Sequence, residues 1–317
     1  MDVLTDVLNV LELKGWLSSR TEMASPWRFE FAASRDITFH ILSCGRGYLS
    51  VEGEPVPRRV EDGDVMVFPS GHAHAIYDEL ASPLTEVVQL DYDAHGKCQF
   101  FPCEGKGEEP KMVMLCGAFH FEHPGDYPLL HRLPKVIYIP GEQGRMAYGF
   151  ADLVRFIAHE SGSQQPGAEV MLRRLTEMLF IQVVRVWIDQ QADVSGGGLA
   201  ALRDQPISTA LGLMHQSPER GWKVEELAEA VALSRSAFSS RFTHLVGEPP
   251  MKYLTHWRMH MAKRLLKKEV EMEKIAQLLG YDSEVAFRKA FKREVGTPPA
   301  RYRKRGEPVS TNTIPHV

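Results

Sequence analysis

Histidines and cysteines in the first half of the chain carry side chains that bind transition metals. His72 and His74 are two residues apart, a spacing that places both imidazoles on one face of a strand. Cys103 and Cys116 follow, and imidazole together with thiolate is a ligand set that suits zinc. Four such ligands complete a tetrahedral shell, which makes a site structural or sensory because no position remains for a catalytic water. The sequence therefore predicts one zinc ion at His72, His74, Cys103 and Cys116.

The spacing of these residues also leaves other interpretations open. Cys98, Cys103 and Cys116 lack the CxxC spacing of common zinc sites, so buried thiols and redox-sensing thiols are alternatives. The histidines are compatible with hydrogen-bonded core residues or with a surface pair. The residues that would substitute for any of the four ligands are His40, His95, His120 and Cys98.

A second group of side chains is suited to binding a small effector. It combines guanidinium, imidazole and phenol groups from successive strand-like segments. The candidate effector contacts are Arg28, His40, Arg46, Tyr48 and His74.

A 20-residue pattern occurs twice in the last third of the chain, at 234–253 and 283–302. Nine residue types match in one register, 49 positions apart: Ser234, Ala237, Phe238, Phe242, Val246, Gly247, Pro249, Pro250 and Tyr253 recur as Ser283, Ala286, Phe287, Phe291, Val295, Gly296, Pro298, Pro299 and Tyr302. Each copy predicts a helix, a short turn and a second helix that begins after an N-cap serine. This arrangement is a helix-turn-helix, the motif that places one helix in the major groove of DNA.

The outer faces of the two second helices carry the candidate DNA contacts. The repeated phenylalanines mark the inner faces. Arg288 has a guanidinium that can pair with guanine through two hydrogen bonds, and Glu284 can accept one from cytosine. The linking helix expected at 251–268 adds Lys263 as a phosphate contact. The full set is Arg235, Ser236, Ser239, Ser240, Thr243, Lys263, Glu284, Val285, Arg288, Lys289 and Lys292.

Charge separates this segment from the rest of the chain. Residues 207–306 hold 19 Lys+Arg and 11 Asp+Glu, a net charge of +8, whereas the remaining residues hold 18 and 30, a net charge of −12. A basic segment on an acidic chain indicates a polyanionic partner for that segment alone.

The elements that must position these groups change character along the chain. Short runs with Gly-containing turns in 28–92, and again near 111–123 and 133–140, predict an antiparallel β-sandwich or barrel. Residues 144–192 predict two helices. The second helix has more apolar residues than one buried face needs, which indicates either a wholly buried helix or one that also packs on a second subunit, with Leu175, Leu179 and Val183 as the predicted dimer contacts. Residues 193–206 are the expected linker and 307–317 a disordered tail.

Length and composition narrow the class of protein. A chain of 317 residues predicts two domains. Four cysteines do not make a disulfide scaffold, and a cytoplasmic location is expected. The sequence has no run of 18 apolar residues, so no membrane partner is expected. Residues 1–15 predict a short amphipathic helix and not a signal peptide.

Residues 207–305 resemble the C-terminal DNA-binding domain of AraC/XylS-type transcription regulators. The resemblance rests on three segments: LAEAVALSRSAFSSRF, the central WRMHMAKRLL (in which HM and Arg264 occupy variable positions), and IAQLLGYDSEVAFRKAFKREVGTPPARYR. It implies seven helices and binding to double-stranded promoter DNA. It also implies control through the N-terminal domain by an effector. A homodimer is expected from the excess apolar surface of the second helix, and RNA polymerase is a further expected partner.

The N-terminal segment resembles a cupin. Gly63-x5-Pro69-x-Gly71-x2-His74 matches the second half of the cupin signature, but Thr38 stands where the first half has its metal-binding glutamate. The resemblance implies an α+β, multidomain chain with a cupin-like β-barrel and a helical hairpin, followed by an all-α domain with two helix-turn-helix units. The expected domains are a sensor at 1–143, a dimerisation segment at 144–192, and the DNA-binding domain at 207–306.

Three functions are compatible with these features. The favoured one is a sequence-specific transcription regulator controlled by a small-molecule, metal or redox signal. The alternatives are a cupin metalloenzyme tethered to DNA, which would hold iron or manganese, and a constitutive dimeric DNA-binding protein.

Overall fold

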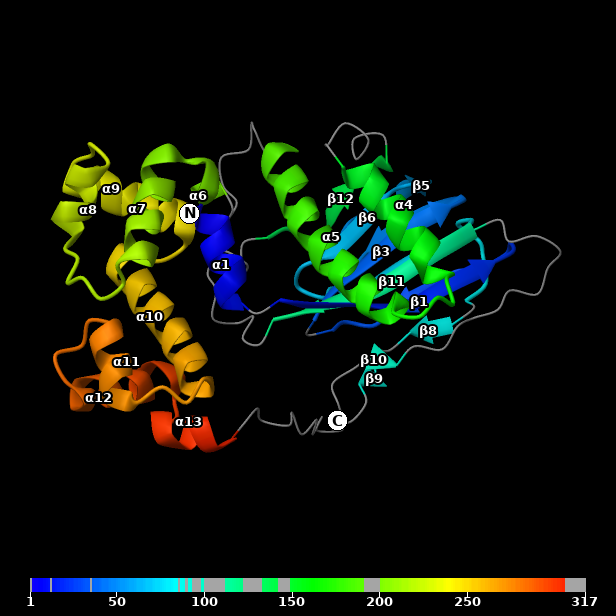
Figure 1. Ribbon diagram of the computed structural model, residues 1–317. Helices are drawn as coiled ribbons and strands as arrows, with labels where there is room; N and C mark the ends of the chain where they lie inside the picture. Colours follow the sequence, from blue (N-terminus) through cyan, green and yellow to red (C-terminus); the bar gives the residue numbers. More distant parts are fainter. Residues whose placement is uncertain are drawn as a thin grey trace, which may run out of the picture. The chain divides into compact units, whose positions relative to one another are not determined.

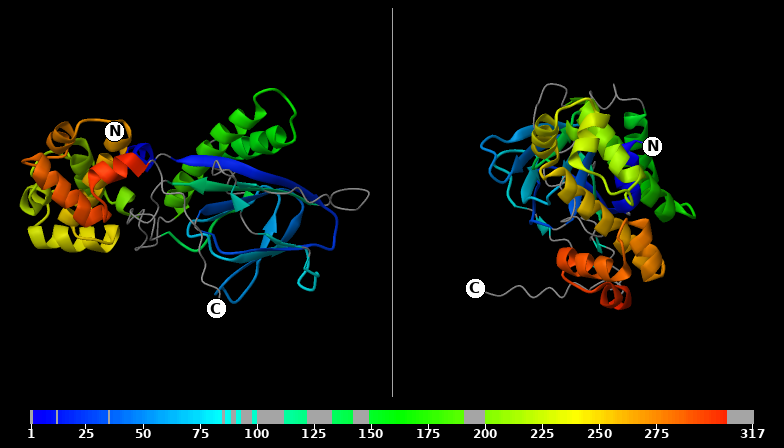
Figure 2. Two further views of the ribbon diagram at one scale, coloured as in Figure 1. Left: turned by 90° about the horizontal axis from the view of Figure 1, so that it is seen from below. Right: turned by 90° about the vertical axis from the view of Figure 1, so that its left-hand side faces the viewer.

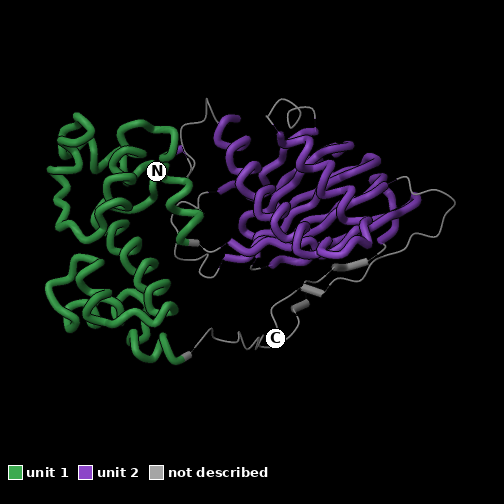
Figure 3. The backbone as a smooth tube through the Cα atoms, in the orientation of Figure 1, with its two compact units in different colours: residues 1–10, 201–317 green, residues 11–200 purple. Residues whose placement is uncertain are grey.

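The chain forms two compact units (Figure 3). The barrel unit comprises Leu11–Ala200, and the helical unit comprises Met1–Val10 with Ala201–Val317. The computed structural model describes residues 2–11, 13–34, 36–84, 86–88, 91–92, 98–99, 112–121, 133–141, 149–190 and 200–305. Cys103, His95 and the tail expected at 307–317 lie outside the described residues, as do residues 193–199 of the expected linker.

Two five-stranded sheets form the barrel unit (Figure 1). The first has the order β1-β11-β3-β6-β12, with β1 (Lys14–Met23), β11 (Met112–His120), β3 (Ile37–Cys44), β6 (Val65–Phe68) and β12 (Ile137–Ile139). The second has the order β5-β4-β7-β2-β8, with β5 (Arg58–Glu61), β4 (Arg46–Val51), β7 (His74–Tyr77), β2 (Arg28–Phe31) and β8 (Glu86–Val88). A two-stranded ribbon joins β9 (Asp91–Tyr92) and β10 (Cys98–Gln99).

The core of this unit lies between the two sheets. Alternate residues of β2 and β4 are buried, as expected for strands with one face in a core. Strand β11 is buried on both faces: Met112, Met114 and Cys116 belong to the core between the sheets, and Phe119 packs against Phe180 of a covering helix. The predicted cupin-like fold class is confirmed. Strand β1 was not predicted, because its sequence KGWLSSRTEM is mostly polar.

Two helices cover the sheet that contains β1 (Figures 1 and 2). They are α4 (Phe150–Ser161) and α5 (Ala168–Gln190), close to the predicted helices. The predicted dimer contacts Leu175, Leu179 and Val183 are at most 7% exposed, because they face the barrel unit's own interior. That assignment was wrong: these side chains are not available to a partner subunit.

The helical unit contains the seven helices implied by the resemblance. They are α7 (Gln205–Gln216), α8 (Val224–Ala230), α9 (Arg235–Val246), α10 (Pro250–Lys267), α11 (Met272–Leu278), α12 (Glu284–Val295) and α13 (Pro299–Arg305). A short helix, α6 (Ala200–Arg203), occupies part of the expected linker. The hydroxyls of Ser234 and Ser283 accept from the backbone N–H groups of Ala237 and Ala286, which confirms both predicted N-caps.

The N-terminal helix α1 (Val3–Leu11) belongs to the helical unit and not to the barrel unit. Val3 and Val7 are about as buried as the core residues of that unit, and Val3 lies close to Gly212 of α7. The sequence placed this segment in the sensor at 1–143. Amphipathic character predicts that a helix packs on something, but it does not identify the surface on which it packs.

Candidate nucleic-acid interface and sensory core

Helix α9 presents the first set of candidate DNA contacts. Phe238 and Phe242 are fully buried and fix the inner face of the helix. Arg235, Ser236 and Ser240 are exposed on the other side, and Ser239 and Thr243 are half-buried. Arg235 pairs with Glu225 of α8 at 3.0 Å, an exposed contact that DNA phosphates can replace at small cost.

Helix α12 presents the second set and has the stronger base-reading groups. Phe287 and Phe291 are fully buried, whereas Val285 is 61% exposed and Arg288, Lys289 and Lys292 are exposed. Glu284 and Arg288 form an ion pair with each other, one helical turn apart. Glu284 therefore holds the guanidinium in the free protein, and the two predicted base contacts act on one another before DNA arrives.

Lys263 does not belong to this interface. It is 8% exposed, within α10, between the buried Met259 and Leu266. The predicted phosphate contact was wrong. Lys263 is four residues after Met259 and three before Leu266, and this spacing on the apolar face of the helix was the signal that should have excluded it.

Three polar side chains form a hydrogen-bonded chain inside the barrel. Nδ1 of His40 lies 3.0 Å from Sγ of Cys116, and Nε2 of His40 lies 2.7 Å from Nε2 of His74. Nδ1 of His74 lies 2.8 Å from the carbonyl oxygen of His72. Cys116 and His40 are cross-strand partners on β11 and β3, whereas His74 is on β7, so the chain of hydrogen bonds joins the two sheets.

The geometry fixes where each proton resides. A carbonyl oxygen only accepts, so Nδ1 of His74 carries a hydrogen and donates it to His72. In the neutral ring Nε2 of His74 is then an acceptor, which makes Nε2 of His40 the donor. Nδ1 of His40 is left as an acceptor for the thiol proton of Cys116.

Burial keeps all three groups uncharged. Burial lowers the pKa of His74 to about 4 and lowers the pKa of His40 well below its usual range. Burial raises the pKa of the Cys116 thiol to about 12. The thiol therefore keeps its proton at neutral pH, and the resting sulfur is a poor nucleophile.

The remaining predicted metal and effector residues are placed differently. His72 is half-buried and Cys103 lies outside the described residues. Arg28 and Tyr48 lie on the outer face of the second sheet, where both contact the ring of Tyr77. They are therefore separated from His40 and His74, and the five predicted effector contacts do not form one pocket.

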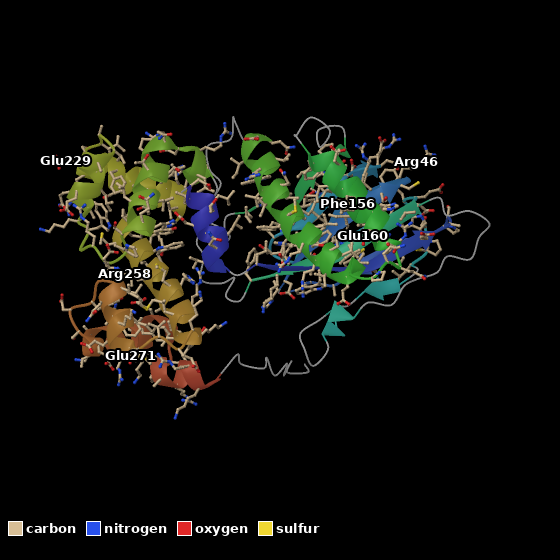
Figure 4. All side chains as sticks on the ribbon, viewed as in Figure 1. Arg46, Phe156, Glu160, Glu229, Arg258 and Glu271 are labelled. Atoms are coloured by element: carbon tan, nitrogen blue, oxygen red, sulfur yellow. The ribbon has the colours of Figure 1, made fainter. Side chains whose placement is uncertain are left out.

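Arg46 instead lines an open cavity of about 910 Å³ in the barrel unit. Figure 4 shows Arg46 on β4. The cavity also contains the exposed thiol of Cys44. Its lining is rich in carboxylates, of which Asp64 accepts hydrogen bonds from the Tyr138 hydroxyl and the Gly141 amide.

The described residues do not reproduce the usual cupin metal site. Thr38 occupies the glutamate position, and the facing nitrogens of His40 and His74 are hydrogen-bonded to each other. In the part of the chain that the structure describes, no three His, Cys, Asp or Glu side chains are arranged to hold a metal ion.

Family models match both units. A model described as "Cupin" matches residues 2–189, and a helix-turn-helix domain model matches residues 227–305. The chain belongs to the AraC-type transcription regulators that have an N-terminal cupin domain. It is a DNA-binding transcription regulator, as its helix-turn-helix domain and its full-length relatives show.

Several relatives match nearly the whole chain. An AraC-like transcription regulator of Streptomyces lividans is 30% identical and covers 96% of this chain and 98% of its own. The regulator AlkR of Acinetobacter baylyi is 29% identical, with 96% and 99% coverage. The RCS-specific activator RclR of Escherichia coli is 26% identical, with 96% and 98% coverage. Among solved structures, the DNA-binding domain of AdpA with target DNA is 32% identical, covers 32% of this chain and 91% of that chain, and has a TM-score of 0.30.

None of the described helices is long and apolar enough to cross a membrane.

Proposed function

We propose that this chain is a homodimeric promoter-binding regulator whose DNA occupancy is set by a signal received at Cys116 inside the cupin barrel. The observation that carries this proposal is the Cys116–His40–His74 chain. Apolar residues would fill this space without the cost of desolvating polar groups, so a connected polar chain in a barrel core indicates a use other than packing.

The chain is suited to converting a change at one sulfur into a change in the barrel. Zinc binding at Cys116 releases the thiol proton that His40 accepts, whereas hydrogen peroxide converts the S–H group to a sulfenic S–OH with loss of water, which moves the proton away from its position opposite Nδ1 of His40. His40 then loses a partner while its other nitrogen still faces His74 across the gap between the sheets. An unsatisfied buried polar group costs about 1–3 kcal/mol, enough to shift an equilibrium between two barrel arrangements. The related RclR is named as an RCS-specific activator, which supports a chemical signal for this chain.

Two structural routes lead from Cys116 toward the rest of the protein. Strand β1 pairs with β11, with Ser19 opposite Cys116, and α5 packs closely on β1, since a Cβ at Gly15 would lie 3.0 Å from the side chain of Thr176. In the sequence, β1 follows shortly after α1, which is part of the helical unit. A shift of β1 is therefore proposed to act on α5 through packing and on the helical unit through the chain itself.

The α4–α5 hairpin supplies the proposed dimer surface. Its large exposed apolar side chains are Phe156, Val170, Met171 and Met178. Phe156 lies on α4 (Figure 4), and Met171 and Met178 are seven residues apart on one face of α5. Exposed methionines and a phenylalanine on one hairpin are typical of a surface that a partner covers. A second copy of this chain is the proposed occupant, and RNA polymerase is the proposed partner at the promoter.

The test compares two thiols of the same barrel. DNA sites are first selected from a random duplex library with the reduced, metal-free chain. Binding to those sites is then measured with zinc and, separately, with hydrogen peroxide, for wild type, Cys116→Ala and Cys44→Ser. We expect at least one treatment to change the affinity of wild type and Cys44→Ser, and neither to change that of Cys116→Ala. An unaltered response in Cys116→Ala would place the signal elsewhere.

A further inference from the structure

Helix α10 joins the two helix-turn-helix motifs, and its side chains also tie one motif to the other. The first motif is α8 and α9, preceded by the loop 217–223, and the second is α11 and α12. Two residues of α10, Arg258 and His256, contact both motifs. They are two positions apart, so they project from nearly opposite sides of the helix.

Arg258 connects the loop before the first motif with the turn of the second. Its Nε donates to the carbonyl oxygen of Pro218 at 2.7 Å, and its Nη2 donates to that of Arg220 at 2.9 Å. The guanidinium carbon lies 5.8 Å from the ring centre of Tyr281, in the turn between α11 and α12. Figure 4 labels Arg258 on α10. The Arg258 guanidinium thus forms two hydrogen bonds to the loop before the first motif and lies against Tyr281 of the second motif.

The backbones of the two motifs also meet at this point. Gly280 has a φ of 71°, and a side chain there would come within 2.0 Å of the carbonyl oxygen of Glu219. The turn of the second motif therefore rests directly on the loop that Arg258 holds. Tyr281 packs in turn against Phe287 of α12, so the contact reaches the second recognition helix.

His256 forms a brace on the other side of α10. Its Nδ1 lies 3.0 Å from Oε2 of Glu248, which follows the first recognition helix, and its Nε2 lies 3.9 Å from Oε2 of Glu294 in α12. The hydrogen bond to Glu248 raises the pKa of His256. The other charged groups here are Lys252, 3.8 Å from Glu248, and Arg293, 2.7 Å from Glu294.

We propose that Arg258 and His256 are positioning residues that hold the two recognition helices at one separation and one rotational phase on DNA. This inference rests on α9 and α12 both entering the major groove. A rigid connection makes the second half-site contact effectively intramolecular, which raises affinity by about 100-fold or more only when the spacing of the half-sites fits. A loose connection accepts several spacings and gains less at each of them.

The experiment selects bound sequences from a random 40-base-pair duplex library, using the full chain. The readout is the distance between the two half-site sequences contacted by one protomer. Wild type is expected to select one spacing, about 10 base pairs from centre to centre. Arg258→Gln is expected to select the same half-sites at several spacings. Its preference for two half-sites over one should fall about tenfold.

Arg220→Gln is the matched control. Arg220 is also an arginine stacked on an aromatic ring, 4.0 Å from Trp222, but its side chain stays within the first motif. It should retain the wild-type spacing.

If circular dichroism shows that Arg258→Gln does not fold, His256→Gln is tested in its place. The His256 side chain is 29% exposed and lies at the surface, so replacing it should leave the fold intact. If Arg258→Gln folds and keeps the single wild-type spacing, the inference is overturned. If it does not fold, the same result for His256→Gln overturns it. A wild-type chain that selects no paired half-sites would instead contradict DNA reading by both helices.

Discussion

Nδ1 of His215 in α7 lies 3.6 Å from Oδ2 of Asp6 in α1, and both atoms are buried without a hydrogen-bond partner among the described residues. His215 also approaches the Tyr253 hydroxyl at 2.8 Å and stacks on Trp257. Burial raises the pKa of Asp6 and lowers the pKa of His215 to about 3. The N-terminal helix is therefore seated over an ionisable pair at the centre of the helical unit.

Acid is expected to destabilise the helical unit through His215. In the unfolded chain the imidazole takes up a proton near pH 6.5, whereas in the folded unit it remains neutral to about pH 3. The stability that depends on neutral His215 is thus fully present above pH 6.5 and is lost as the pH falls toward 3, by about 1.4 kcal/mol per pH unit. Thermal unfolding at pH 7.5 and 5.0 measures this, and His215→Phe should show a weaker pH dependence. An equal dependence in both proteins would contradict the assignment.

A charge placed under α1 should detach that helix. Val7 is 6% exposed, so Val7→Asp puts a carboxylate in an apolar contact, whereas Asn9→Asp puts the same charge on the exposed side of α1. In hydrogen exchange, the α1 amides of Val7→Asp should exchange at least about tenfold faster, since about 1.4 kcal/mol of lost stability corresponds to a factor of ten. The amides of α9 and α12 should not change. Comparable exchange in the two variants would show that α1 does not depend on this contact.

Dimer formation should depend on the exposed apolar side chains of the α4–α5 hairpin. Met178 is 51% exposed, so covering each copy of it contributes up to about 1 kcal/mol, roughly half of the value for a fully exposed methionine. Sedimentation of the full chain at about ten micromolar should show a dimer for wild type and a monomer for Met178→Glu. Val56→Glu is the control, because Val56 is 73% exposed and lies outside the hairpin. A dimeric Met178→Glu would place the interface on another surface.

Zinc at His72, His74, Cys103 and Cys116 stays a prediction. His40 stands between Cys116 and His74, so a zinc ion that binds both must displace this imidazole or use it as a ligand. Protein purified without chelator should then carry about one zinc ion per chain, and uptake by metal-free protein should release the Cys116 proton. Cys116→Ser should lose the metal and Cys44→Ser should keep it. Metal-free wild type with unchanged stability would leave a hydrogen-bonded core instead.

Periodicity and repetition made the helical unit predictable, whereas contacts distant in sequence did not leave a comparable signal. The duplicated serines and phenylalanines predict both N-caps and both inner faces, because these features are set within one or two turns of helix, and the duplicated glycines Gly247 and Gly296 coincide with the C-caps of α9 and α12. The pairing of His40 with Cys116 depends on strand register across 76 residues, and no local pattern encodes it. The same limit applies to Arg258, whose partners lie about 20 to 40 positions away in the sequence.

Base discrimination should be concentrated at Arg288. Its ion pair with Glu284 gives a way to separate sequence-specific base contacts from nonspecific electrostatic attraction to DNA. Arg288→Ala should weaken binding to the selected site by about 1–3 kcal/mol and binding to random duplex much less, because the guanidinium pairs with guanine. Lys292→Ala should weaken both about equally and reduce the salt dependence, because a phosphate contact carries no sequence information. Glu284→Gln releases the guanidinium from its partner in α12. It should therefore raise affinity for random duplex while relaxing the preference at the base pair that Arg288 reads. Titrations of both duplexes at two salt concentrations measure all three variants, and equal losses on selected and random DNA for Arg288→Ala would show that this side chain contacts only the backbone.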